Sequence, residues 1–314
     1  IFRHSPFYFE MGLRHAYNWG AGRGHNVGGW LKRRRDISHI NPEASRNLNY
    51  FSEVQICTAG VFDEDHHCLG YTRLLKEGVT GIIQRIDQRK ADTSARDEIC
   101  FLDAAERSCR AVIRIAARFG EQARAMLEGE RDPQARRFLG MIAATAGRVP
   151  AYPPHSFYEG LAALWFLREA CATLEGVGIS VIGHPDRQLI ELYRSDLEEG
   201  RLDDQEARDL IARWLLTTDI RFNVHENKWP ESSTCMELGG CDEEGTPVYN
   251  ELTRMILEVH HELGLLNPKP NCRYSIGAPQ EYLDLMSRQV LAGHNVVAFH
   301  NDDVLIPALV RHGR

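Results

Sequence analysis

The second half of the chain alternates short apolar runs with amphipathic helical patterns, and this alternation limits the possible folds more than any other feature. Runs typical of strands lie at residues 178–182, 235–238, 271–276 and 296–300, and helical patterns lie at residues 185–199, 203–215, 247–264 and 279–291. Strands and helices that alternate in this way form a parallel sheet, because each helix must carry the chain back across the sheet. We therefore expect an α/β fold with parallel strands and crossover helices over residues 176–314.

Polar residues follow the expected strands. A Gly-Gly-Cys-Asp turn occupies residues 239–242, an Ile-Gly-Ala loop occupies residues 276–278, and His-Asn-Asp occupies residues 300–302. In parallel sheets the loops at the carboxyl ends of the strands carry the chemistry. The sequence therefore predicts a functional rim built from these three loops.

The chain before residue 176 has a different pattern. Apolar residues step by three and four from Leu102 to Met126, which predicts one face of a long helix. A second helix is expected at residues 132–145. Ser156 and Glu159 form a capping-box pattern before a helix that is apolar nearly all round and is therefore expected to be buried.

These patterns predict one partial domain over residues 1–314. Within it we expect an irregular, loop-rich start at residues 1–96, a helical part at residues 97–175 and the alternating part at residues 176–314. Because the first residue is Ile and the last is Arg314, we expect a piece of a longer polypeptide.

Composition excludes several classes of protein. A net charge of -7 disfavours sequence-independent nucleic-acid binding. Eight cysteines are scattered without a CxxC pair, which indicates reduced thiols in a cytoplasm rather than a disulfide framework. No apolar run approaches the length of a membrane span, and no signal peptide is present at the start of the sequence.

Two sets of residues raise the alternative of a zinc hydrolase. One is His66, His67 and Cys68, although adjacent histidines rarely bind one ion with good geometry. The other combines more distant residues: Cys235, Cys241, His260 and His261. Neither set has the spacing of a known metal motif, so we expect no metal site.

Five stretches follow one another in the order of a known family's motifs. They are residues 71–78 (YTRLLKEG), 150–159 (PAYPPHSFYE), 183–202, 238–252 and 299–302 (FHND). Over roughly residues 65–310 the chain resembles the glycyl radical enzymes, the pyruvate formate-lyase-like superfamily. Its members include pyruvate formate-lyase and radical dehydratases of glycerol, choline and hydroxyproline. The resemblance is nearer to the dehydratases and eliminases.

The resemblance implies an α/β barrel that encloses a dry site, in which a glycyl radical and a thiyl cysteine exchange a hydrogen atom. It implies radical cleavage of a C–O, C–N or C–C bond in a small polar metabolite. It also implies an anaerobic, cytoplasmic homodimer whose glycyl radical is installed by a radical S-adenosylmethionine activating enzyme. The thiyl cysteine and the radical glycine are expected beyond Arg314, so no catalytic residue is expected here and the isolated chain should be inactive.

The resemblance also suggests roles for individual residues. His66 falls on a position that contacts the departing hydroxyl in dehydratases, although His67 could take that place. Ser180 lies near a substrate-binding position. Three residues match motif positions expected to support the barrel rim: Asp186, Asn301 and Asp302. Cys241 is not assigned to the radical site.

The sequence leaves open a function of another class. A catalytically inactive binding or scaffold protein that retains the half-barrel would carry the same motifs. Neither the substrate nor the branch of the family follows from the residues, because several motif positions depart from the family pattern. His184, for example, stands where the family has Arg.

Overall fold

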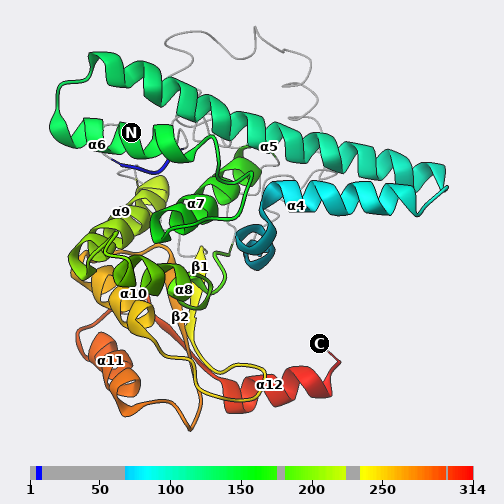
Figure 1. Cartoon of the computed structure of the whole chain (residues 1–314). Helices are drawn as coiled ribbons and strands as arrows, with labels where there is room; N and C mark the ends of the chain where they lie inside the picture. The colour runs from blue at the N-terminus through cyan, green and yellow to red at the C-terminus, as the bar shows by residue number, and fades with distance from the viewer. Residues whose placement is uncertain (1–4, 9–67, 175–180, 224–233, 295, 314) are drawn as a thin grey trace, which may run out of the picture.

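The computed structural model describes residues 5–8, 68–174, 181–223, 234–294 and 296–313 (Figure 1). Within them, helices dominate and a small parallel sheet lies in the second half. The elements are α4 (Tyr71–Ala91), α5 (Arg96–Gly129), α6 (Pro133–Thr145), α7 (Phe157–Leu174), α8 (Pro185–Glu198), α9 (Asp204–Asn223), β1 (Cys235–Gly239), α10 (Glu251–Glu262), β2 (Lys269–Tyr274), α11 (Gln280–Leu291), β3 (Ala298–Asn301) and α12 (Asp302–Arg311).

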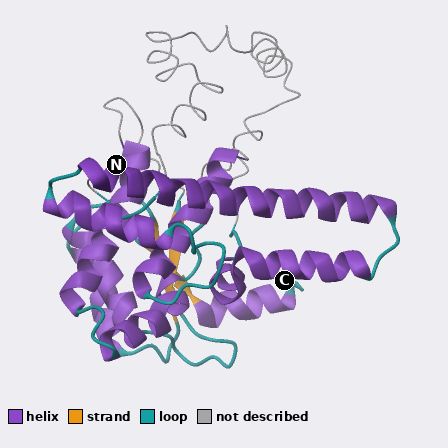
Figure 2. Ribbon diagram, turned by 45° about the horizontal axis from the view of Figure 1, so that its top comes forward, coloured by secondary structure: helices purple, strands orange, loops and turns teal. Residues whose placement is uncertain are grey.

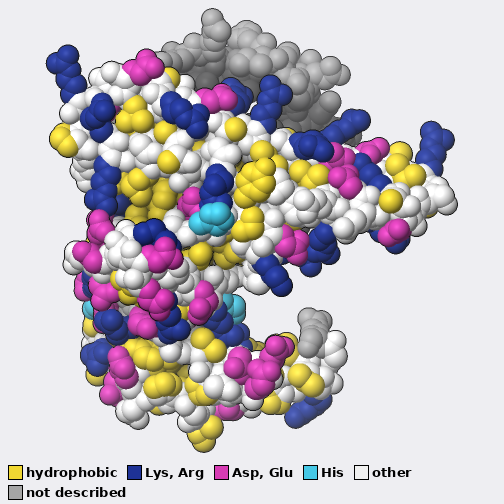
Figure 3. Space-filling view, in the orientation of Figure 1, with side chains coloured by type: hydrophobic (Ala, Val, Ile, Leu, Met, Phe, Trp, Pro, Cys, Tyr) yellow, Lys and Arg dark blue, Asp and Glu magenta, His cyan; other side chains and the backbone are white. Residues whose placement is uncertain are grey.

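Helix α4 and the first part of α5 run side by side as an arm that projects from the rest of the protein, whereas the rest of α5 packs on α6 (Figures 1 and 2). Lys90 joins them, because its Nζ lies 2.6 Å from carboxylate oxygens of both Asp103 and Glu106. Helix α12 projects from the opposite end, and the surface between it and the arm is hollowed into a broad recess (Figure 3).

Helix α4 differs from the irregular start expected for residues 1–96, of which only residues 5–8 and 68–96 are described. It spans Tyr71–Ala91 with a break at Gly78, whose φ is 65°. A Cβ at Gly78 would lie 2.7 Å from the backbone of Tyr152, so only glycine permits this close packing. Glycine has low helix propensity and weakens the sequence pattern, whereas burial of apolar residues such as Leu74 and Ile83 stabilises the helix.

Helix α7 lies at the centre of the helical part, as its apolar sequence predicted. The backbone N of Glu159 donates to Ser156 Oγ at 3.2 Å, which forms half of the expected capping box. Trp165 and Phe166 are fully buried. The helix contacts α4, α5, α8 and α9, so it joins the arm to the second half of the chain.

The three strands are parallel and lie in the order β1-β2-β3, which confirms the predicted parallel strands with crossover helices. Leu238 of β1 is opposite Cys272 of β2, which is opposite Phe299 of β3. The backbone N of Ile182 donates to the carbonyl of Cys235 at 2.9 Å, so residues 181–183 run along the other edge of β1. Among the described residues the sheet is open and does not close into a barrel.

The two faces of the sheet differ. Met236, Leu238 and Cys272 are fully buried and pack with residues of α10 and α11 in the main hydrophobic core. The intervening residues of β1 and β2 are half-buried and mostly polar: Cys235, Glu237, Lys269, Asn271 and Arg273. In Figure 1 the strands lie beside α8, which contacts β1 and contributes to the same core.

Two helices differ from the prediction: α10 begins later than expected, and α12 was not expected. A helix was predicted to start near Pro247, but α10 starts at Glu251, because the side chain of Asn250 caps it by accepting from the backbone N of Leu252 at 2.9 Å. Pro247 instead pairs with Cys241 in an antiparallel bridge. Helix α12 was not predicted, since Pro307 lies within it. None of the described helices has the length and apolarity that crossing a membrane requires.

Candidate functional site

Asp186 fixes the corner that follows β1. Its carboxylate is fully buried in the first turn of α8. Oδ2 accepts hydrogen bonds from the backbone N of Gly239 and from Thr253 Oγ1, both at 2.8 Å, and Oδ1 accepts from the backbone N of Arg187 at 2.9 Å. Burial raises the pKa of Asp186, and the bonds from Gly239 and Thr253 oppose that rise. One side chain therefore joins α8, β1 and α10.

Two arginines hold the same corner from its other sides. Arg187 Nη2 donates to the carbonyl oxygens of Gly239 at 2.5 Å and Cys241 at 3.0 Å. Arg273 Nε donates to Asp302 Oδ1 at 2.8 Å, while Asp302 Oδ2 accepts from the backbone N of Cys241 at 3.0 Å. The ends of β1, β2 and β3 are thus connected by charge-assisted hydrogen bonds, which are the strongest kind in proteins.

The corner itself requires glycine. Gly239 and Gly240 have φ values of 65° and 84°, in the left-handed region that other residues rarely adopt. A Cβ on Gly240 would lie 2.7 Å from Asp302 Oδ2 and 2.9 Å from Arg187 Nη2. Two consecutive glycines therefore let the backbone approach the carboxylate and the guanidinium closely.

Two further groups at the corner are kept neutral. His184 Nε2 lies 3.4 Å from Arg273 Nη1. Burial, helped by the positive charges of Arg187 and Arg273, lowers the pKa of His184 to about 4. Burial and the hydrogen bond to Asp302 raise the pKa of the Cys241 thiol, whose Sγ lies 3.4 Å from Asp302 Oδ2. At neutral pH the corner therefore holds a neutral imidazole and a neutral thiol.

The structure brings together part of the site that the sequence predicted. Asp186 and Asp302 both contact the 239–241 corner. Asn301 caps α12, since its Oδ1 accepts from the backbone N of Asp303 at 2.9 Å. His66 and Ser180 lie outside the described residues, so their substrate-binding roles stay predictions. The rim-support role of the other three residues also stays a prediction.

Sequence reasoning missed Arg187 and Arg273 as parts of this network, and it placed Gly240 in the predicted rim without predicting its contacts. The signal for Gly240 was present, because consecutive glycines between a strand and an acidic residue indicate a close backbone approach. No local signal marks the two arginines, because their partners lie on other elements. Arg187 is 52 residues from Gly239, and Arg273 is 29 residues from Asp302.

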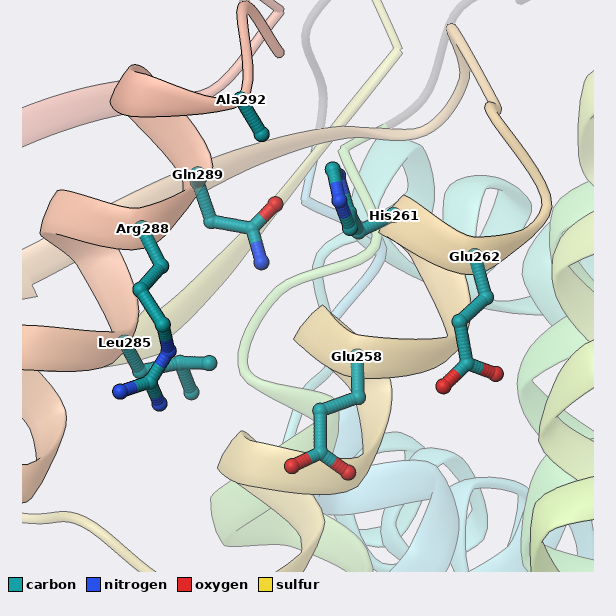
Figure 4. A pocket seen from close by; sticks show the side chains of 7 residues that line it. All are labelled: Glu258, His261, Glu262, Leu285, Arg288, Gln289 and Ala292. Atoms are coloured by element: carbon teal, nitrogen blue, oxygen red, sulfur yellow. The ribbon is translucent and has the colours of Figure 1, made fainter.

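A cavity of about 340 Å³ lies elsewhere, between α10 and α11 (Figure 4). Its walls carry residues of both signs: Glu258, His261, Glu262, Leu285, Arg288, Gln289 and Ala292. Both glutamates already pair with Arg208. The cavity lies among the helices that cover the apolar face of the sheet, away from the strand-end corner, so we do not assign it to the candidate site.

The histidines and cysteines of the proposed zinc sets do not come together in the part of the chain that is described. No group of three or more His, Cys, Asp or Glu side chains there is arranged to hold a metal ion. Cys241 instead contacts Asp302, and His260 lies on α10 with its ring centroid 5.1 Å from that of His294. His66 and His67 lie outside the described residues.

Comparison with known proteins gives a consistent result. A family model described as pyruvate formate lyase-like matches residues 30–314. The trans-4-hydroxy-L-proline dehydratase of Clostridioides difficile is 25% identical in an alignment of 305 residues that covers 91% of this chain and 38% of that protein. The isethionate sulfite-lyase of Oleidesulfovibrio alaskensis is 27% identical in an alignment of 257 residues that covers 77% of this chain and 31% of that protein.

Solved structures agree in fold. The hydroxyproline dehydratase from Clostridioides difficile with bound trans-4-hydroxy-L-proline has a TM-score of 0.76 at 22% identity. The match covers 99% of this chain and 43% of that one. A glycyl radical enzyme from Archaeoglobus fulgidus has a TM-score of 0.74 at 22% identity, with 98% of this chain and 43% of that one covered. The chain spans less than half the length of these relatives. Together the matches confirm the resemblance that the motifs indicated.

Proposed function

The chain belongs to the pyruvate formate lyase-like family, and we propose on that premise that it forms part of a glycyl radical enzyme of the dehydratase or lyase type. The family match over residues 30–314 is the observation that carries the proposal. The relatives named as a dehydratase and a sulfite-lyase both support an elimination that cleaves a C–O or C–heteroatom bond of a small polar molecule.

In this proposal the residues of the chain form one wall of the substrate site and keep the strand ends in position. A glycyl radical, installed after translation, supplies the hydrogen-atom abstraction. Asp186, Arg187 and Asp302 fix the strand-end corner through buried hydrogen bonds, so that groups at the carboxyl ends of the strands keep their positions. Such pre-organisation lowers the cost of orienting a substrate.

Cys241 does not fit the role of the thiyl cysteine. Its side chain is 8% exposed, and its Sγ is bonded to the buried carboxylate of Asp302. Burial and the negative charge of Asp302 raise the pKa of the Cys241 thiol, so it stays protonated. Burial also restricts access to the sulfur. We therefore propose that the thiyl cysteine lies outside residues 1–314, and that these residues alone are inactive.

The proposal includes the partners that the family implies. These are a radical S-adenosylmethionine activating enzyme, a small-molecule substrate and a second copy of the protein in a homodimer. It also includes an anaerobic, cytoplasmic setting, because a carbon-centred radical is destroyed by oxygen. The family match supports each of these indirectly, through the chemistry that its members share.

The test is anaerobic expression of the complete gene product that contains these residues, together with a radical S-adenosylmethionine activating enzyme. We expect a glycyl radical signal in the electron paramagnetic resonance spectrum. Consumption of one compound is then expected in a panel of trans-4-hydroxy-L-proline, isethionate, glycerol and 1,2-propanediol. Absence of the radical, under conditions in which the hydroxyproline dehydratase forms it, would refute the proposal.

A binding or scaffold protein is the second candidate. The hydrogen bonds of the corner favour it, since the carboxylates of Asp186 and Asp302 already accept from backbone and guanidinium donors of the protein. For this candidate the complete gene product would fold and bind a ligand or a protein, but would form no radical with the activating enzyme.

A further inference from the structure

The sheet has a polar face, which is unusual for parallel strands. Parallel sheets are normally covered on both faces, so their strands carry apolar residues in nearly every position. Here Met236 and Leu238 of β1 face the core, whereas Glu237 between them is half-buried on the opposite face. On β2, Cys272 faces the core and Asn271 lies beside Glu237 in the parallel register.

Glu237 and Asn271 form a hydrogen-bonded pair in which one buried acceptor, Asn271 Oδ1, has no partner among the described residues. Asn271 Nδ2 donates to Glu237 Oε1 at 2.7 Å. A buried acceptor without a hydrogen bond has lost its contact with water and gained none in return, which is unfavourable. A hydrogen-bond donor from a bound molecule would satisfy this acceptor.

The neighbouring residues on this face are cationic. Lys269 and Arg273 lie two residues before and after Asn271 on β2, which places them on the same face, each roughly 7 Å along the strand. Arg273 Nε is bonded to Asp302. The pair of acceptors therefore stands between two positive side chains, and the whole row faces away from the helices that cover the core.

We propose that Glu237 and Asn271 are substrate-contacting residues that accept hydrogen bonds from the hydroxyl or ammonium groups of a small polar molecule. The inference rests on the proposed function, because it makes the polar face of the sheet one wall of the substrate site. It adds two residues that no motif marks. The carboxylate of Glu237 favours cationic and hydroxylated molecules over apolar ones of the same size.

The first experiment measures binding to the complete gene product that contains these residues. Saturation-transfer difference NMR is carried out with ethanolamine, glycerol and 1,2-dimethoxyethane, the last of which has no hydrogen-bond donor. We expect binding of ethanolamine or glycerol and none of dimethoxyethane. Glu237→Gln, which removes the charge but keeps the size, should weaken ethanolamine binding at least tenfold. Preferential binding of one probe identifies ammonium or hydroxyl as the recognised group.

A matched control and a second variant complete the test. Glu243→Gln removes a carboxylate from the exposed turn after Cys241 and should leave binding unchanged. Asn271→Ser tests the other acceptor, and circular dichroism checks that each variant folds. Equal binding by the wild type, Glu237→Gln and Asn271→Ser would overturn the inference, as would failure of the wild type to bind both donor-bearing probes.

The complete gene product separates this inference from the proposed function. If a glycyl radical forms, Glu237→Gln should leave the radical signal unchanged but lower kcat/KM at least tenfold. Unchanged turnover would overturn the inference while leaving the proposed function intact. If no radical forms, the proposed function fails, and the NMR measurements still decide whether the polar face binds donor-bearing molecules.

Discussion

Replacing Asp186 should lower the free energy of unfolding more than replacing an exposed residue does. Asp186→Ala removes the acceptor of the Gly239 N–H, the Thr253 hydroxyl and the Arg187 N–H. Two of these donors would remain buried, and each buried donor left without a partner costs about 1–3 kcal/mol. Removal of a charge that burial already disfavours offsets part of the loss. The expected net loss is about 3 kcal/mol.

The assay is urea unfolding followed by circular dichroism, compared with Asp203→Ala. Asp203 is exposed, and its Oδ1 accepts one hydrogen bond, from the backbone N of Glu206 at 2.8 Å, at the start of α9. Loss of such a cap costs about 1 kcal/mol. Asp186→Asn keeps the volume but replaces one acceptor oxygen by a donor, so it should fall between the two alanine variants. The reasoning is refuted if Asp186→Ala and Asp203→Ala lose the same stability.

Three further outcomes are expected. Gly240→Ala should lower the free energy of unfolding by about 2 kcal/mol and lower Tm, because φ is 84° and the new Cβ would meet Asp302 Oδ2 at 2.7 Å; an unchanged Tm would contradict this. Burial, followed by the charge of the neighbouring His294, lowers the pKa of His260 to about 3 in the folded protein. As the pH falls from about 6.5 towards 3, His260 therefore binds a proton in the unfolded protein but not in the folded one. Wild type should therefore lose stability relative to His260→Phe in that window, and parallel curves of unfolding free energy against pH would exclude the effect. Val304 and Val310 of α12 are 66% and 69% exposed, so replacing both by Lys should reduce self-association in sedimentation velocity; a wild type that is monodisperse at high concentration would argue against it.

Local patterns were sufficient for elements whose determinants are close in sequence. The pattern at Ser156 and Glu159 predicted the start of α7, and the run at 235–238 predicted β1 to within one residue. The parallel direction of the strands followed from the alternation of strands and helices, because a helix between two strands can carry the chain back across the sheet. These features depend on periodicity and capping, which can be read from neighbouring residues.

The remainder depends on contacts between distant residues. Helix α4 is stabilised by packing that overrides the low propensity of Gly78. The start of α10 depends on the cap by Asn250, which also donates from Nδ2 to the backbone carbonyl of Asp186 at 3.1 Å. Arg187 and Arg273 gain their roles only when the chain is folded, so neither could be selected from a sequence in which arginines are common.

Asp302 occupies a position with a mechanical consequence. It follows the last residue of β3, begins α12, and accepts hydrogen bonds from Arg273 and from the backbone N of Cys241. Because these hydrogen bonds of Asp302 are short and shielded from water, a tilt of α12 would also move the turn after β1. A load or a bound partner acting on α12 would therefore be transmitted to the far side of the sheet through a single carboxylate.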